Sequence, residues 1–388
     1  PIFYSSLKDT FIFASSPSAV ICNIDKKKIN YNAINSYLSN VYISSHQTIW
    51  KNVERLSPAS YLIIKPGKKA KIIKYWDYLN LPPIKENRNL IMEKVRKSLN
   101  KSVLNCLDAD VTVGVFLSGG VDSSLIAAMA KQHNKNIKAF SLGYVEQKYN
   151  EMPYAEKVAK HLSINHEKII IGVDDVIKVL PNLVKSFGQP FGDASAIPTY
   201  FLSKFARKHV KVCLSGDGGD ELFGNFGRWT LLEKTQYDFF KSSLQFDTLF
   251  FNRKYFFTEE LKNKLLNNNT KHSTSKYLQD IVNDKKLKNI RDKIMFLDIK
   301  TQLQDEYCNV VNKFSMANQI EARAPFLDNE FSNLMFSVPS DVRTSKKDFK
   351  YLLRKAMENI IPKENLNNRK IGFVGLESQK INYNFNEL

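Results

Sequence analysis

The sequence has few cysteines and no long apolar runs. Its 388 residues include four cysteines, and these lie far apart at Cys22, Cys106, Cys213 and Cys308. No CxxC pair or Cys/His grouping occurs, so we expect reduced structural thiols rather than disulfides or a zinc site. No stretch approaches the roughly 18 apolar residues of a membrane span, and the N-terminus lacks the basic-then-apolar pattern of a signal peptide. We therefore expect a cytoplasmic protein without a membrane partner.

Acidic residues are in the minority. The chain has 57 Lys and Arg against 39 Asp and Glu, a formal net charge of +18. Such an excess can attract ATP or nucleic acid. The lysines are scattered among many asparagines, as in residues 24–32 and 261–270, without a repeated basic-aromatic register. We interpret most of the excess as compositional bias and a solvated face, which favours a protein without a nucleic-acid partner.

A glycine-rich turn lies within residues 113–124, VGVFLSGGVDSS. A short β-branched apolar run precedes it, typical of a buried parallel strand, and a helix is expected to begin near Asp122 or Ser123. Gly119 and Gly120 lack a Cβ, so their backbone N–H groups can approach phosphate oxygens at the positive end of that helix. No GxxxxGK[ST] motif occurs near the turn, so the pattern indicates pyrophosphate binding rather than γ-phosphate transfer. A turn without a ligand is the plainer alternative.

A second segment, residues 210–225 (VKVCLSGDGGDELFGN), repeats this arrangement with acidic side chains. A short apolar strand is again followed by a Ser-Gly turn, and Asp217, Asp220 and Glu221 stand among glycines. Carboxylates this close repel one another unless a cation is present. The segment therefore predicts a Mg²⁺ site at the mouth of the sheet, completed by bound phosphates, with an acidic solvated loop as the alternative.

Five motifs together produce a family resemblance. In chain order they are SGGVDSS (118–124), SLGY (141–144), PFGDASAIPTY (190–200), LSGDGGDELFGN (214–225) and IEARAPFLD (320–328). They resemble the synthetase domain of the glutamine-hydrolysing asparagine synthetases, which are PP-loop ATP pyrophosphatases, from about residue 89 to the end. The resemblance implies an α/β fold with a doubly wound parallel sheet. The alternation of helical and strand patterns after residue 90 predicts the same fold.

The resemblance also implies a reaction. A carboxylate oxygen would attack the α-phosphate of ATP, giving an acyl-adenylate and pyrophosphate, and ammonia would then form the amide and expel AMP. The acceptor would be aspartate or a related acid, Mg²⁺ would accompany ATP, and glutamine would supply ammonia in a full-length form. A homodimer is compatible with the resemblance.

Site residues carry over from the family motifs by position. The residues expected to hold pyrophosphate are Ser118, Gly119, Gly120, Ser123 and Ser124. Those expected to contact the adenosine part of ATP are Leu117, Leu142, Ser215 and Gly216. Those expected to anchor Mg²⁺ are Asp122 and Asp220. The residues expected to act catalytically are Asp217, near the reacting carboxylate, and Lys370, against the α-phosphate. Glu321 and Arg323 are expected to form a structural ion pair holding a helix at the wall of the site.

The first 80 residues differ from the rest. Residues 11–22 and 48–77 show strand-like alternation broken by Pro and Gly turns, which predicts antiparallel sheet. This part resembles the closing portion of the glutaminase domain of the same family. We therefore expect a class II amidotransferase remnant over residues 1–80, a linker over 81–89 and the synthetase domain over 90–388.

Two positions depart from the family pattern. The glutaminases of this family use a cysteine at the first mature position, and this sequence has Pro1 there. We expect either a portion of a longer protein or a natural short form that uses free ammonia or another amine. Ala194 stands where the best-understood asparagine-forming members place an arginine that orients the substrate. The acceptor is thus open between aspartate and a related carboxylate.

Three function classes follow. The first is an amidotransferase that forms asparagine or amidates a related acid. The second uses the same adenylation with an internal amine, as β-lactam and lasso-peptide cyclases do, although those relatives usually diverge at the acidic loop. The third is a PP-loop tRNA-modifying enzyme, which would normally carry an added RNA-binding or metal-binding module. Because the acidic loop is kept and no such module is visible, we favour the first class.

Overall fold

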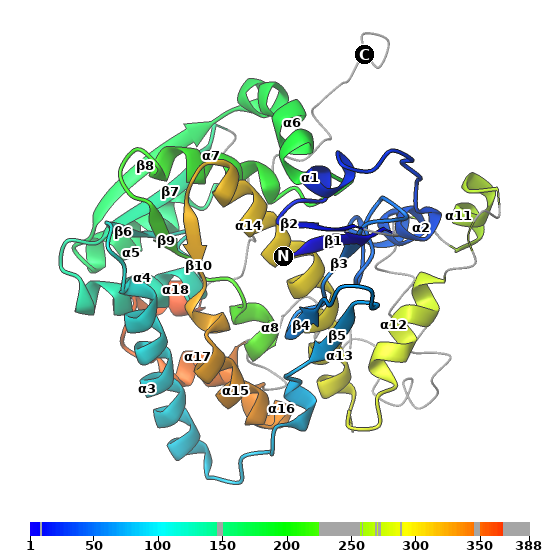
Figure 1. The fold of residues 1–388 in the computed structure, drawn as a ribbon. Coiled ribbons are helices and arrows are strands. Elements are labelled where there is room, and N and C mark those ends of the chain that lie inside the picture. The colour runs from blue at the N-terminus through cyan, green and yellow to red at the C-terminus, as the bar shows by residue number, and fades with distance from the viewer. Residues whose placement is uncertain are drawn as a thin grey trace.

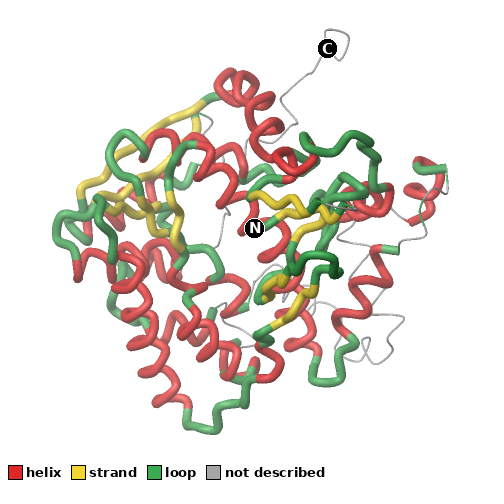
Figure 2. Tube along the Cα trace, viewed as in Figure 1, coloured by secondary structure: helices red, strands yellow, loops and turns green. Residues whose placement is uncertain are grey.

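The structure is a computed structural model of the chain. It describes residues 1–7, 10–145, 150–224, 257, 259–267, 270, 273–287, 289–344 and 350–367. Figure 1 shows short N-terminal strands on one side and a larger parallel sheet on the other, with α14 between them. Coloured by secondary structure, the strands form separate groups among helices (Figure 2). Within the described residues, no helix combines the length and apolar character needed to cross a bilayer.

The N-terminal part contains two small antiparallel sheets, ordered β2-β1-β3 and β4-β5, as the sequence predicted. One expectation was wrong in detail: strand structure in residues 11–22 ends at Ala14, and a short helix begins at Pro17. Proline suits the first turn of a helix, and Val20 and Ile21 bury against Phe3. The elements are β1 (Phe3–Ser6), β2 (Phe11–Ala14), α1 (Pro17–Ile21), α2 (Tyr31–Asn40), β3 (Glu54–Arg55), β4 (Ser60–Ile63), β5 (Lys71–Lys74) and the 3₁₀-helix η1 (Tyr78–Asn80).

The larger sheet has five parallel strands in the order β10-β9-β6-β7-β8, which confirms the predicted fold class. Its strands are β6 (Val113–Phe116), β7 (Lys138–Tyr144), β8 (Asn165–Ile171), β9 (Val212–Leu214) and β10 (Glu321–Arg323). Val115 pairs with Ala139 on one side and Leu214 on the other, and all three are fully buried. The chain leaves β6 toward β7 on one side and reaches β9 on the other. In such sheets, ligands bind at the carboxyl ends of the two strands where the order reverses.

Helices cover both faces of the parallel sheet. One core joins the sheet to α3, α4, α5, α15 and α17, a second joins it to α6 and α7, and a third packs α6, α7 and α14 against one another. The helices before residue 224 are α3 (Arg88–Leu107), α4 (Val121–His133), α5 (Met152–His161), α6 (Val173–Phe187), α7 (Ala196–Ala206) and α8 (Gly219–Phe223). The later ones are α11 (Glu259–Leu265), α12 (Thr274–Val282), α13 (Ile290–Asp298), the π-helix η4 (Ile299–Tyr307), α14 (Cys308–Ala317), η5 (Pro325–Leu327), α15 (Asn329–Ser337), α16 (Ser340–Arg343), α17 (Tyr351–Ala356) and α18 (Lys363–Asn367).

Glu321 and Arg323 lie in the edge strand β10. Arg323 Nε donates to Glu321 Oε1 at 2.8 Å, so the predicted ion pair forms. Arg323 Nη1 also donates to the carbonyl oxygens of Cys106 and Asp108, at 3.0 and 2.7 Å. The arginine therefore ties the edge strand β10 to the C-terminal end of α3.

Candidate active site at the ends of two parallel strands

The two glycine-rich turns meet in space. One follows β6 and the other follows β9, at the point where strand order reverses. A Cβ on Gly216 would lie 2.9 Å from Ser123 N, and one on Gly219 would lie 2.6 Å from Asp122 Oδ1. A side chain at Gly216 would meet the backbone of α4, and one at Gly219 would displace the Asp122 carboxylate, so the two glycines let the turns pack closely. Together the turns line one cavity of about 470 Å³.

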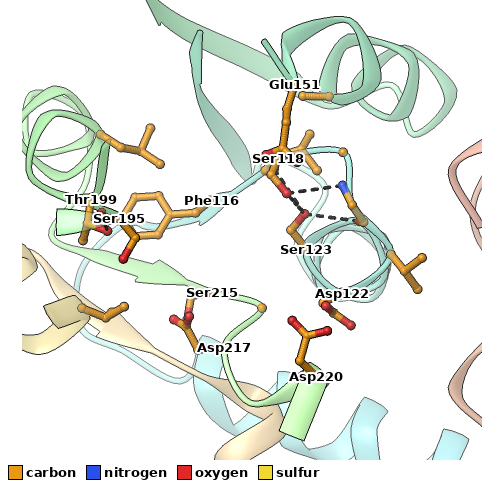
Figure 3. Close-up of a pocket in the computed structure, with 18 of the residues that line it drawn as sticks. Phe116, Ser118, Asp122, Ser123, Glu151, Ser195, Thr199, Ser215, Asp217 and Asp220 are labelled. Carbon is orange, nitrogen blue, oxygen red and sulfur yellow. Dashed lines mark hydrogen bonds between the residues drawn. The ribbon is translucent and has the colours of Figure 1, made fainter. Parts of the chain in front are cut away.

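Hydrogen bonds to its own serine hydroxyl groups fix the shape of the first turn. Ser118 N donates to Ser123 Oγ at 3.2 Å, and the two serine hydroxyls lie 3.0 Å apart (Figure 3). Gly120 N donates weakly to Ser118 Oγ at 3.3 Å. These donors lie beside the N-terminus of α4, whose dipole favours an anion. The turn therefore presents hydroxyl and N–H groups suited to phosphate oxygens.

Most of the predicted site residues border this cavity. Those that line it are Leu117, Ser118, Gly119, Gly120, Asp122, Ser123, Leu142, Ser215, Gly216, Asp217 and Asp220. Ser124 does not line it, because its side chain is fully buried in α4. Lys370 lies outside the described residues. The structure thus brings together eleven of the thirteen residues that the motifs singled out.

A buried lysine joins the two turns, and no motif marked it. Lys350 Nζ forms ion pairs with Asp122 and, at 3.0 Å, with Asp220. Burial alone would lower the pKa of Lys350, but the two carboxylates outweigh it and raise the pKa above its ordinary value. In the sequence this residue is one lysine among many in SKKDFKYLLRK, so only the fold reveals its place.

The same two carboxylates fit a divalent cation. Asp122 and Asp220 come from different turns and approach each other (Figure 3). Both carboxylates lie within ion-pair distance of the same atom, Lys350 Nζ. Among the described residues, no group of three or more His, Cys, Asp or Glu side chains is arranged to hold a metal. Two carboxylates leave most of the octahedral shell of Mg²⁺ to water and phosphate oxygens, which is its usual arrangement in nucleotide sites.

Asp217 lies in an environment that resists ionisation. Burial raises its pKa, and the negative charges of Asp122, Asp220 and Asp193 raise it further, while a hydrogen bond from Ser215 opposes the shift. A carboxylate with a raised pKa is a stronger base than an exposed aspartate. The position therefore suits a group that accepts a proton during a reaction.

The cavity continues beyond the first turn. Figure 3 shows Ser118 and Ser123 on one side of the Phe116 ring, and Ser195 and Thr199 of the α7 region on the other. Asp193 accepts hydrogen bonds from Ser195 N at 2.8 Å and Ser195 Oγ at 2.7 Å. This second half is also lined by Ala194, Leu202, Leu303, Tyr307 and Val311. The cavity thus extends from the first turn to the start of α7.

A smaller cavity of about 220 Å³ adjoins this half. It shares Asp193 and Ala194 with the main cavity. Part of its lining comes from the N-terminal part, at Asn40, Val41 and Tyr42. The π-helix η4 lines both cavities, and π-helical turns are frequent at functional sites. The N-terminal part therefore borders a space that adjoins the main cavity at Asp193 and Ala194.

The sequence matches the family described as asparagine synthase over residues 94–387, and a glutamine amidotransferase domain over residues 1–76. The chain belongs to the asparagine synthase family. Its match to this family confirms the resemblance inferred from the five motifs.

Individual relatives agree with this family. The glutamine-hydrolysing asparagine synthetase 1 of Bacillus subtilis (strain 168) is 29% identical over 401 residues, covering 96% of this chain and 63% of that relative. Putative asparagine synthetase 2 of Methanocaldococcus jannaschii is 34% identical over 252 residues, covering 63% of this chain and 48% of the relative. A solved NMN synthetase from Francisella tularensis aligns with a TM-score of 0.28 and 14% identity, covering 60% of this chain and 96% of that one. This chain thus spans less than two thirds of the length of these curated relatives.

Proposed function

We propose that this chain carries the synthetase site of an ATP-dependent amidotransferase of the asparagine synthase type. The site adenylates a carboxylate with release of pyrophosphate, and ammonia then attacks the activated carbonyl to give an amide and AMP. The observation that carries the proposal is the contact between the two strand-end turns. A donor-rich turn and an acidic turn there share one cavity at the switch point of a parallel sheet.

The binding roles follow from which residues line each part of the cavity. Ser118, Gly119, Gly120 and Ser123 hold the departing pyrophosphate, while Ser124, buried behind the turn, stays outside this set. The contacts to the adenosine part come from Leu117, Leu142, Ser215 and Gly216. Asp122 and Asp220 would hold Mg²⁺, which would neutralise charge on the phosphates.

Asp217 and Lys370 carry the catalytic roles in this proposal. The raised pKa of Asp217 equips it to take a proton from the attacking ammonia. Lys370 places an ammonium against the α-phosphate, where it stabilises developing negative charge. The ammonia enters from the N-terminal side, a route that the shared walls of the two cavities support.

The acceptor binds between α7 and the acidic turn. Among the described residues that line the main cavity, six are carboxylates and one, Lys350, is basic. This balance favours an acceptor that carries an amino group, as aspartate does, because an ammonium offsets the negative lining. Related amino acids with a free side-chain carboxylate fit the same description.

One experiment tests the proposed reaction. The protein is incubated with ATP, Mg²⁺, ammonium and a panel of carboxylates that includes aspartate, and pyrophosphate release is measured. We expect release with an amino-group-bearing acceptor, together with equal amounts of AMP and amide. Production of ADP and orthophosphate would overturn the proposed bond cleavage. Product formation that persists without ammonium would instead favour the cyclase-like alternative, in which an internal amine attacks.

A further inference from the structure

The first turn is also held from outside by a side chain that no motif contains. Asn365 lies in α18, near the far end of the described chain, and is fully buried at the wall of the main cavity. Its Nδ2 donates to the carbonyl oxygen of Gly119 at 2.9 Å and to that of Tyr154, in α5, at 3.2 Å. Both amide hydrogens are thereby used on backbone oxygens.

The contact with Gly119 fixes the orientation of one peptide group. In a trans peptide, the C=O and N–H point in opposite directions, so holding the Gly119 oxygen sets the direction of the Gly120 N–H. That N–H points toward Ser118 Oγ, at 3.3 Å, on the cavity side. The peptide lies between two glycines, whose backbones rotate more freely than those of other residues. Without an external hydrogen bond, the Gly119–Gly120 peptide could reverse.

A reversed peptide would change the charge that the turn presents. The partially negative carbonyl oxygen would then face the anion site, and one N–H donor would be withdrawn from it. Gly119 itself packs closely against α5, because a Cβ there would lie 2.4 Å from Ala155 N. The turn is therefore clamped between α5 and Asn365, and the amide of Asn365 decides which end of the peptide faces the ligand.

We propose that Asn365 is a positioning residue for the phosphate-binding turn, which keeps the Gly120 N–H directed at the pyrophosphate group of the nucleotide. This inference rests on the proposed function of the cavity. It predicts a selective effect: binding of the phosphate part depends on Asn365, and binding of the nucleoside part does not.

The test separates these two parts. Binding of inorganic pyrophosphate with Mg²⁺, and separately of AMP, is measured by calorimetry for the unchanged protein and for Asn365→Leu, which keeps the bulk but removes both donors. Asn365→Ala provides a second variant without added apolar bulk, and Lys363→Ala changes an exposed residue of the same helix as the control. Thermal melting shows that each variant is folded.

We expect both Asn365 variants to bind pyrophosphate about tenfold more weakly, with AMP binding unchanged, because a buried donor to the turn is lost. Lys363→Ala should bind both ligands normally. Equal weakening of AMP and pyrophosphate, or pyrophosphate binding within about twofold of the unchanged protein, would overturn the positioning role. If the unchanged protein binds neither ligand, the proposed function itself fails, which is a distinguishable result.

Discussion

The turn after β6 and the turn after β9 share one backbone plan but differ in charge. Each follows a short buried strand, each contains a glycine with positive φ (Gly119 and Gly218), and each leads into a helix. The first turn is lined with hydroxyl and N–H donors, whereas the second contributes Asp217, Asp220 and Glu221 to the cavity. The same local geometry thus places a donor-rich turn and an acidic turn side by side.

The difference extends to how each turn is supported. The first turn is clamped by α5 and Asn365. The second packs against η5, since a Cβ on Gly218 would lie 2.4 Å from Leu327 Cδ2. Lys350 then pairs with one carboxylate from each turn. The motifs supply the chemical groups, and distant segments set the relative position of the turns.

Asp217→Asn removes the proposed general base from the turn after β9 (residues 215–221, the acidic turn). It leaves the turn after β6 (residues 118–124, the donor turn) intact. General-base catalysis contributes roughly 100- to 10,000-fold, so we expect amide formation to fall by that range while pyrophosphate binding is retained. In the unchanged protein, the rate should fall as pH drops through the raised pKa of Asp217, at a higher pH than for an exposed aspartate. The pH profile of amide formation checks this, and an unchanged profile in the variant would rule out Asp217 as the base.

Asp217→Asn should raise the stability of the fold, although it lowers the rate of amide formation. Because the pKa of Asp217 is higher in the folded protein, the native state binds this proton more tightly, and ionisation lowers stability as pH rises through that pKa. Asp217→Asn removes this loss. We therefore expect a higher melting temperature for the variant than for the unchanged protein at pH 7, and a smaller difference in acid.

Lys350→Met tests the link between the turns. Removing one partner of a buried ion pair typically lowers the free energy of unfolding by about 3–5 kcal/mol, and here it leaves Asp122 and Asp220 facing each other. Chemical denaturation with and without Mg²⁺ measures the effect, and we expect Mg²⁺ to stabilise the variant more than the unchanged protein. The control is Lys355→Met, which breaks an exposed pair with Glu358 and should change stability by less than about 1 kcal/mol. Equal losses in the two variants would show that Lys350 does not hold the turns together.

Gly119→Ala should damage the donor turn alone. A Cβ there would lie 2.4 Å from Ala155 N at a φ of +82°, so the turn must move, and a displacement of about 1 Å can weaken function about 100-fold. Gly67→Ala is the matched control, because Gly67 has a φ of +70° but open space around it. Both variants carry the strain of left-handed backbone, yet only the first should lose ATP binding in a titration. Similar ATP affinities for the two would show that the turn tolerates the shift.

The sequence predicted the features that are local and missed those that depend on distant contacts. The two turns, the helix after β6 and the parallel sheet follow from apolar runs next to glycine motifs. Lys350 and Asn365 could not be found, because nothing near them in the sequence distinguishes them from other lysines and asparagines. Ser124 shows a subtler limit. It belongs to the motif, but one helical step of about 100° turns it from the cavity side of Ser123 into the core.

Short strands were hard to predict for another reason. β10 consists of Glu321, Ala322 and Arg323, which show no apolar alternation, and it forms because β9 offers a free parallel edge. The sequence of residues 11–22 is apolar enough to suggest a strand throughout, but Pro17 favours a helix start, and tertiary packing decides the outcome.

Ser141→Ala should produce the smallest effect of these substitutions. It removes a hydrogen bond through which β7 supports the donor turn. Ser141 Oγ donates to the carbonyl oxygen of Leu117 and lies 2.7 Å from His166 Nε2. Burial, with help from Lys168, lowers the pKa of His166 and so favours its neutral ring. Losing one buried hydrogen bond should reduce the free energy of unfolding by about 1 kcal/mol and raise the KM for ATP a few-fold. Ser102→Ala is the control, since Ser102 Oγ donates to the Pro325 carbonyl away from the turn.

A similar stability loss in both variants, with a KM change only in Ser141→Ala, would show that β7 helps to shape the donor turn. Identical KM values would show that Ser141 stabilises the core and does not shape the donor turn.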